Sequence, residues 1–195
     1  MSFDKVVLKF ASPALCGIKP SCLFSMTEDT FFQVFPRIRK WNQSLSAFGR
    51  KLVVLKTLCT YLIFVYDQNL LEKTVCEFNA ISYLKEKNYP VNKGSEKILH
   101  ELFRRLCENK SSGFPHEVGL FLGYPLEDVK CFERFGGRGS KYTGSWAVYG
   151  DVESACRKMK EYRKCSDECC ALYDKGLNVV DISTNYKANI MKEVC

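Results

Sequence analysis

Apolar side chains recur every three or four positions in several long stretches of the chain, which is the period of an amphipathic helix. The clearest stretch follows Thr27, a residue type that favours the position just before a helix, and it ends at Gly49. The helices predicted in this way run from Thr27 to Gly49, over residues 68–88, from Ser95 to Leu106, from Pro125 to Gly136 and from Asp151 to Tyr162, with a short one around Cys169–Tyr173 before a polar tail.

Other stretches are short and rich in β-branched and aromatic residues. Residues 51–56 (KLVVLK) and 60–67 (TYLIFVYD) are predicted to be paired strands. The continuous apolar run VGLFLGY, residues 118–124, indicates a strand buried on both faces, and WAVYG, residues 146–150, a further strand. Predicted helices outnumber predicted strands, and the two kinds of segment do not alternate regularly along the chain. The pattern therefore predicts an α+β fold: a single domain over residues 1–195 with a small mixed or antiparallel sheet flanked by several amphipathic helices.

Length and composition agree with one soluble domain. A chain of 195 residues that is 46% hydrophobic is long enough for one substantial core. The first residues, MSFDKVVLKF, lack the uninterrupted apolar segment of a signal peptide. The longest apolar run, residues 52–66, contains Lys56 and is shorter than the roughly 20 residues of a membrane-spanning helix. We therefore expect a cytoplasmic protein that does not associate with membranes.

The net charge of +7 is spread along the chain. A nucleic-acid-binding protein normally gathers its basic residues on one element, with aromatic residues among them, so we expect no nucleic-acid partner. Only the segment Arg157–Lys164 is locally dense in basic residues, and the helical period places them on the outer face of a helix. This helix could bind an acidic protein, for example an acidic redox protein such as a flavodoxin.

The chain contains 11 cysteines, and without an export signal we expect them to be reduced. Cys165 and Cys169 are one helical turn apart and share a face, which would suit a metal or redox pair. That segment lacks a second pair or a histidine at ligand spacing, and Cys16 and Cys22 are too far apart for C-x-x-C chemistry. The sequence therefore assigns no metal ligand.

His116 and Glu117 are the first candidates for catalysis. His116 precedes the apolar run, and a histidine beside a carboxylate can act as a general base. The alternative is that His116 braces its loop through a backbone hydrogen bond. Neighbouring residues of an extended strand also point to opposite faces, which would separate Glu117 from the imidazole. Both readings stay open at this point.

Four further residues are candidates for ligand binding: Lys19, Tyr124, Lys141 and Tyr142. Lys141 and Tyr142 belong to the glycine-rich loop GGRGSKYTGS, which has neither the phosphate-binding nor the dinucleotide-binding spacing of glycines. In an enzyme they would assist His116. The acids Glu127 and Asp128 begin a helix and would repel an anion there, so they are interpreted as structural or as suited to a cationic partner.

Four motifs carry a resemblance to a known family: SPALCGIKPSCLFSM, LIFVYD, FPHEVGLFLGYPLEDV and SWAVYGDVESA. With them the chain resembles domain-of-unknown-function family 3793, an uncharacterised family of small cytosolic proteins from anaerobic bacteria. The family pattern often has a His-Cys pair where Phe10 and Ala11 stand here, which counts against any family-wide activity that needs that pair. The resemblance implies no established reaction, but it implies a site near His116 and a role in redox or metal physiology.

The leading hypothesis is a binding or accessory protein in anaerobic redox or iron metabolism, with a pocket lined by His116, Glu117, Tyr124 and Lys19. One alternative is a small enzyme that uses His116 as a general acid or base. Another is a protein-interaction module that binds an acidic partner. The sequence identifies no cofactor: iron, haem, flavin and the absence of any ligand all stay open.

Overall fold

Three antiparallel strands form the main sheet: β1 (Ser21–Met26), β2 (Arg50–Lys56) and β3 (Tyr61–Asp67). Their order is β1-β3-β2, so the last strand in sequence lies in the middle. The pairing of β2 with β3 confirms the prediction for these two runs, and β1 is a strand that the pattern did not indicate. Helices flank this small sheet, which confirms the predicted α+β fold.

The computed structural model describes residues 2–58, 60–108 and 113–193, and the side chains of these residues as far as 186. The helices are α1 (Phe3–Leu15), α2 (Glu28–Leu45), α3 (Gln68–Val75), α4 (Phe78–Glu86), α5 (Ser95–Cys107), α6 (Val118–Phe121), α7 (Leu126–Phe135), α8 (Val152–Asp174) and α9 (Val179–Glu193), with 3-10 turns η1 (Ser46–Phe48) and η2 (Val91–Lys93). A two-stranded hairpin is formed by β4 (Tyr142–Thr143) and β5 (Ala147–Val148). None of the helices in these ranges combines the length and the apolar character needed to cross a membrane.

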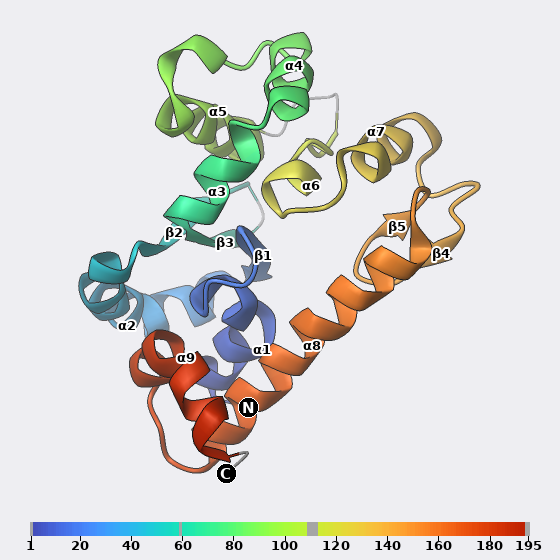
Figure 1. Cartoon of the computed structure of the whole chain (residues 1–195). Helices are drawn as coiled ribbons and strands as arrows, with labels where there is room; N and C mark the ends of the chain where they lie inside the picture. The colour runs from blue at the N-terminus through green and yellow to red at the C-terminus, as the bar shows by residue number, and fades with distance from the viewer. Residues whose placement is uncertain (1, 59, 109–112, 194–195) are drawn as a thin grey trace.

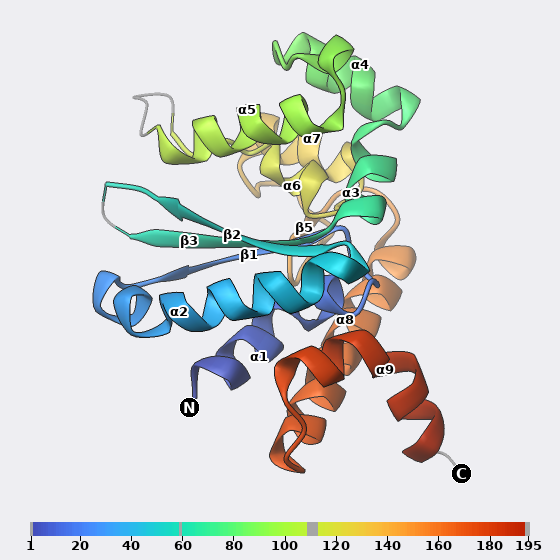
Figure 2. The same cartoon turned by 90° about the vertical axis from the view of Figure 1, so that its left-hand side faces the viewer.

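The sheet lies between two layers of helices, and both of its faces are buried (Figure 2). Along β3, Ile63 and Val65 belong to one apolar core, with residues of α1, α2, α8 and α9. Phe64 and Tyr66 point to the other face and belong to a second core, with residues of α3 to α7. The alternation of side chains along a strand thus divides the interior of the molecule in two.

The longest helix, α8, runs from the β4–β5 hairpin to the layer of α1 and α9 (Figure 1). Its first turn is capped as predicted, because the Asp151 side chain accepts a hydrogen bond from the Ser154 backbone N–H. The segment around Cys169 continues α8 as part of one helix, so the separate short helix that the pattern indicated is not formed. The basic side chains of Arg157–Lys164 are exposed on this helix, as expected.

Four other expectations are wrong: one helix over residues 68–88, where α3 and α4 form instead, a strand at residues 118–124, a polar tail after α8, and a helix cap at Ser95. Residues 118–124 do not form a buried strand: α6 occupies the first four of them, and a turn follows at Gly123. A short, fully apolar run suits a buried helical turn as well as a strand, and periodicity alone does not separate them. The tail after α8 contains α9. In α5, Ser95 does not cap the helix, because its hydroxyl donates to the Glu72 carboxylate instead.

α2 begins with the predicted cap, since the Thr27 hydroxyl accepts from the Thr30 backbone N–H. Near its end, the side chain of Asn42 reaches the outer edge of β2. The Asn42 Nδ2 donates to the Leu52 carbonyl and the Asn42 Oδ1 accepts from the Leu52 N–H, both at 2.7 Å. The carboxamide therefore fixes α2 to the sheet.

Gly123 is required by the fold for two reasons. Its φ is +75°, and a Cβ there would lie 2.8 Å from Pro20 Cδ. We expect Gly123→Ala to lower the free energy of unfolding by about 1–2 kcal/mol for the backbone conformation and by a further ~1–3 kcal/mol for the contact with Pro20. Urea denaturation measures this loss.

Gly136 supplies the matched control for that substitution. Its φ is +58°, but a Cβ there would have no heavy atom within 4 Å. Gly136→Ala should therefore show only the cost of the backbone conformation. If both variants lost the same free energy of unfolding, the chain would be accommodating the new methyl group beside Pro20 without any cost in stability.

Candidate functional site

A cavity of about 380 Å³ lies between α6, α7 and the β4–β5 hairpin. Its walls are mainly apolar and aromatic, and we refer to it as the aromatic cavity. The side chains that define it are Phe114, His116, Val118, Tyr124, Phe132 and Trp146. Two of these, His116 and Tyr124, are residues that the sequence singled out.

One wall of the aromatic cavity is held in place by a buried carboxylate. The rings of Tyr124 and Trp146 are stacked, with centroids 4.7 Å apart and planes 21° from parallel. The Trp146 Nε1–H donates to Asp128 Oδ2 at 2.8 Å. Asp128 Oδ1 accepts from the backbone N–H groups of Tyr149 and Gly150, at 2.7 and 3.0 Å. Asp128, only 2% exposed, is thus structural, as one of the two interpretations proposed.

His116 lies at the rim of the cavity with its side chain exposed. Its ring makes an edge contact with Phe132, with centroids 5.2 Å apart. The His116 backbone carbonyl accepts from the Gly119 N–H and so helps to form the turn into α6. The imidazole itself makes no hydrogen bond to any of the described residues, which leaves both ring nitrogens available to a ligand.

Glu117 does not orient that imidazole. Glu117 is 6% exposed, and its Oε1 accepts from the Tyr89 hydroxyl at 3.1 Å and from Arg105 Nη1 at 2.9 Å. Burial and the nearby Glu117 charge raise the pKa of Tyr89, so its hydroxyl stays protonated and donates. Arg105 also donates to the Lys87 carbonyl. Glu117 therefore joins the segment after α4, helix α5 and the start of α6 in one network.

Lys19 and Tyr124 are brought together, as the predicted pocket requires. The Lys19 Nζ lies 5.2 Å from the centre of the Tyr124 ring and 5.3 Å from that of Tyr162. Burial raises the pKa of the Tyr124 hydroxyl to about 12. Lys19 is not part of the lining of the aromatic cavity, and its link to this site is its contact with the Tyr124 ring.

The two candidates from the glycine-rich loop lie elsewhere on the hairpin. The Lys141 Nζ donates to the Gly150 carbonyl at 3.1 Å. Tyr142 is the first residue of β4 and is 43% exposed. Neither lines the aromatic cavity, so the structure does not gather Lys141 and Tyr142 with His116.

A second cavity, of about 440 Å³, shares Phe114 and His116 with the first and is lined mainly by charged side chains. Its cations are engaged in ion pairs: Lys87 with Glu133 at 3.0 Å, and Arg105 with Glu117. The aromatic cavity thus opens beside a polar region whose charges largely compensate each other.

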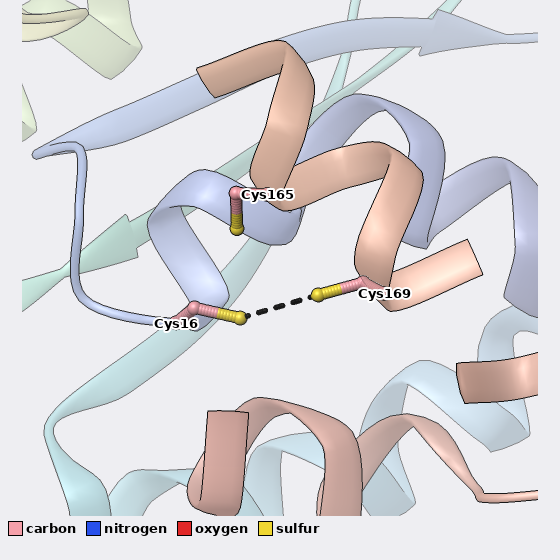
Figure 3. Close-up of side chains that lie close together, drawn as sticks. All are labelled: Cys16, Cys165 and Cys169. Atoms are coloured by element: carbon pink, nitrogen blue, oxygen red, sulfur yellow. Dashed lines mark hydrogen bonds between the residues drawn. The ribbon is translucent and has the colours of Figure 1, made fainter. Parts of the chain in front are cut away.

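A third group of residues lies on the other side of the sheet, and the sequence indicated only two of its three members. Cys16 ends α1, while Cys165 and Cys169 lie on α8, and the three are 5%, 1% and 0% exposed. Their sulfur atoms all lie within 4.8 Å of one another, with Cys16 Sγ and Cys169 Sγ 3.6 Å apart (Figure 3). Hydrogen bonds from the thiols of Cys16 and Cys165 lower the pKa of Cys169.

The spacing of Cys165 and Cys169 correctly predicted a shared helical face. Cys16 is 153 residues before Cys169, and no local spacing could connect them. The only indication in the sequence that Cys16 is buried is its place after Leu15, at the end of an apolar helix.

Comparisons with known proteins identify a family and nothing finer. No curated protein and no solved structure matches the chain significantly. One family profile, described as "Protein of unknown function (DUF3793)", matches residues 7–183 and so covers all of the sites described above. The chain therefore belongs to the DUF3793 family of proteins of unknown function, which is the family that its motifs resemble.

Proposed function

We propose that this protein is a binding protein whose ligand occupies the aromatic cavity. The ligand is a small molecule with a planar, apolar ring system and a polar group at its edge. The observation that carries the proposal is the cavity itself: about 380 Å³ of space with stacked rings on one wall and, at its rim, an imidazole with no hydrogen bond to any described residue.

The size and the walls of the cavity favour this class of ligand. Pockets for small molecules are mostly apolar, with a few polar groups that fix orientation, and range upward from about 300 Å³. Aromatic walls favour flat aromatic ligands, which stack on rings or meet their edges. Because Asp128 fixes Trp146 through a hydrogen bond, this wall is formed before a ligand arrives, and less conformational entropy is lost on binding.

The position of the cavity supports a role that other family members share. Residues of FPHEVGLFLGYPLEDV and of SWAVYGDVESA, two of the motifs that carry the resemblance, line it. A role in anaerobic redox or iron metabolism is kept as the finer part of the proposal, on the strength of that resemblance.

An acid–base role for His116 receives less support. A catalytic histidine is normally oriented by a second group, whereas the Glu117 carboxylate is held by Tyr89 and Arg105. Tyr142 and Lys141, which would assist the reaction, do not line the aromatic cavity. Binding therefore fits the arrangement better than proton transfer does.

The test uses 8-anilinonaphthalene-1-sulfonate, an aromatic anion that fluoresces in apolar surroundings. The chain has two tryptophans, and Trp41→Phe leaves Trp146 as the only tryptophan that can transfer energy to the probe. We expect one site with efficient transfer from Trp146. His116→Ala should weaken binding about 5- to 10-fold, which corresponds to the loss of one hydrogen bond. Ala147→Phe, which adds a ring at the cavity lining, should abolish the site.

His100→Ala is the matched control, because His100 is exposed on α5 and outside the cavity lining. It should bind the probe like the parent protein. Unchanged binding and energy transfer in the folded Ala147→Phe variant would place the probe elsewhere and would refute the proposal. A native mass spectrum of the protein purified without oxygen would then look for a ligand that accompanies it from the cell.

A further inference from the structure

We propose that Cys16, Cys165 and Cys169 form a buried binding site for one Cu(I) ion, held by three thiolate sulfurs. This site is independent of the aromatic cavity and lies on the opposite face of the sheet. Cu(I) replaces the thiol protons, and neither the metal nor the sulfur atoms change oxidation state.

The spacing of the sulfur atoms already suits a metal ion. A soft metal ion binds thiolates at about 2.3 Å, and three sulfurs at that distance from one centre lie about 3.8–4.0 Å apart. Here one pair is 3.6 Å apart and no pair exceeds 4.8 Å. The sulfur atoms therefore need to move by less than ~1 Å to close around an ion.

The backbone holds the three side chains in this arrangement. Cys165 and Cys169 are one turn apart on α8, so their side chains leave the same face of the helix (Figure 3). Cys16 is fixed at the end of α1, where its N–H donates to the Ser12 carbonyl at 2.8 Å. The chain then turns away at Gly17, whose φ is +69°. Since α1 packs along α8, the three sulfurs converge without rearrangement of the backbone.

A disulfide suits this arrangement less well than a metal ion does. Residues one turn apart on a helix have Cβ atoms about 5–6 Å apart, whereas a disulfide needs about 3.5–4.5 Å. Cys165 and Cys169 therefore cannot join without unwinding α8. A bond between Cys16 and Cys169 would have to shorten their separation from 3.6 Å to about 2 Å and would leave Cys165 without a role.

The donor set selects the ion. Among the residues that the structure describes, no histidine or carboxylate joins the three thiols. Two hydroxyls are within reach, but Ser12 Oγ donates to the Leu8 carbonyl and Tyr186 OH to the Glu168 carboxylate. Zn(II) in protein sites almost always takes four ligands. Cu(I) is soft, favours sulfur and needs no fourth donor, so it fits this site best.

The surroundings also suit a Cu(I) site. The three cysteines belong to an apolar core, and fully buried residues of α1 such as Leu8 and Leu15 are part of the same core. Helix α9 packs against both α1 and α8 and covers the region further. Such a site excludes water and oxidants. Metal–thiolate bonding is strong enough to fold small domains, so it can offset the cost of burying the thiolates.

The test uses reduced protein under nitrogen, with Cu(I) supplied as its bicinchoninate complex and Zn(II) in a separate arm. The chain has other cysteines whose thiols can also bind Cu(I), so the readout is a difference between variants. Cys169→Ala should retain one Cu(I) fewer per chain than the parent protein. Cys76→Ala, which removes an exposed cysteine outside the cluster, is the matched control and should retain as much as the parent. X-ray absorption of the parent should show three sulfurs and no lighter ligand.

A second measurement covers the case in which Cys169→Ala does not fold. Cu(I) joins α1 to α8 only in the folded state, so it should raise the melting temperature of the parent by several degrees. It should leave that of the near-isosteric Cys169→Ser variant about where it was.

Three results would overturn the proposal. The first is equal Cu(I) retention and equal melting shifts in the parent and in the Cys169 variants. The second is tighter retention of Zn(II) than of Cu(I), with an oxygen or nitrogen in its coordination shell. The third is a protein that, reduced and folded, takes no Cu(I) but readily forms a Cys16–Cys169 disulfide, which a mass decrease of two hydrogens would reveal. Binding of the fluorescent probe in the aromatic cavity is unaffected in each case, so this failure is distinguishable from failure of the proposed function.

Discussion

Replacing Asp128 by alanine should lower the free energy of unfolding by about 3–5 kcal/mol, since a buried charge-assisted hydrogen bond contributes roughly 1.5–3 kcal/mol and each donor left without a partner adds a cost. Asp128 accepts from three donors: the indole of Trp146 and the backbone N–H groups of Tyr149 and Gly150. No other carboxylate among the described residues makes these contacts. The loss is measured by urea denaturation, followed by fluorescence and by circular dichroism.

The same substitution should also disorder the wall of the aromatic cavity. Without Asp128, the Trp146 indole loses the acceptor that fixes its orientation against Tyr124, so the probe should bind more weakly. Asp128→Asn should lose nearly as much stability, because one side of the amide presents N–H groups to N–H donors. The neighbour Glu127 is exposed, and Glu127→Gln should change stability by less than about 0.5 kcal/mol. Equal effects of Asp128→Asn and Glu127→Gln would show that the hydrogen bonds contribute nothing.

Glu117→Leu should lower the free energy of unfolding by about 3 kcal/mol, the usual cost of removing one partner of a buried ion pair. The substitution leaves the Tyr89 hydroxyl and one side of the Arg105 guanidinium without an acceptor. Glu117→Gln should cost less, because its carbonyl oxygen can still accept from one of them. Thermal and urea unfolding measure both losses.

This prediction separates a structural Glu117 from a catalytic one. If Glu117 served catalysis, its replacement would leave stability near that of the parent protein and would change an activity instead. Glu153→Gln on α8 is the control: Glu153 also forms a pair with an arginine, but it is exposed, and such pairs contribute little. A stability change of Glu117→Leu as small as that of Glu153→Gln would contradict the structural role.

Much of the fold follows from patterns that are local in the sequence. The helix after Thr27 has a good capping residue and a regular apolar stripe, and it forms as predicted. The pair β2 and β3 forms because both runs are rich in β-branched and aromatic residues. Each of these patterns extends over a few helical turns or a few strand residues, so residues close together in the sequence are enough to predict the element.

The failures occur where the surroundings decide the structure. Residues 118–124 are apolar throughout, and such a run does not distinguish a buried helix from a buried strand. The turn at Gly123, directly after α6, packs on Pro20, the residue before β1. This contact is between segments far apart in sequence, and β1 itself was not predicted, so the sequence offered no means to see it.

The candidate sites show the same division. His116 and Tyr124 were chosen from their own stretch of sequence and do line one cavity. Glu117 was chosen for its adjacency to His116, but the donors to its carboxylate are Tyr89, which follows α4, and Arg105 on α5. The pair on α8 was found from its spacing, whereas Cys16 required knowledge of how α1 packs.

The contact between Asn42 and Leu52 has a consequence for self-association. In the order β1-β3-β2, the outer side of β2 is an open edge, and open edges can recruit strands from other molecules. The two backbone groups of Leu52 that a new strand would bind are occupied by the Asn42 carboxamide, which imitates a short piece of strand. An incoming chain would have to displace both hydrogen bonds and the helix that carries Asn42. One side chain thus helps to keep the sheets of separate molecules from joining, which protects the protein against aggregation at that edge.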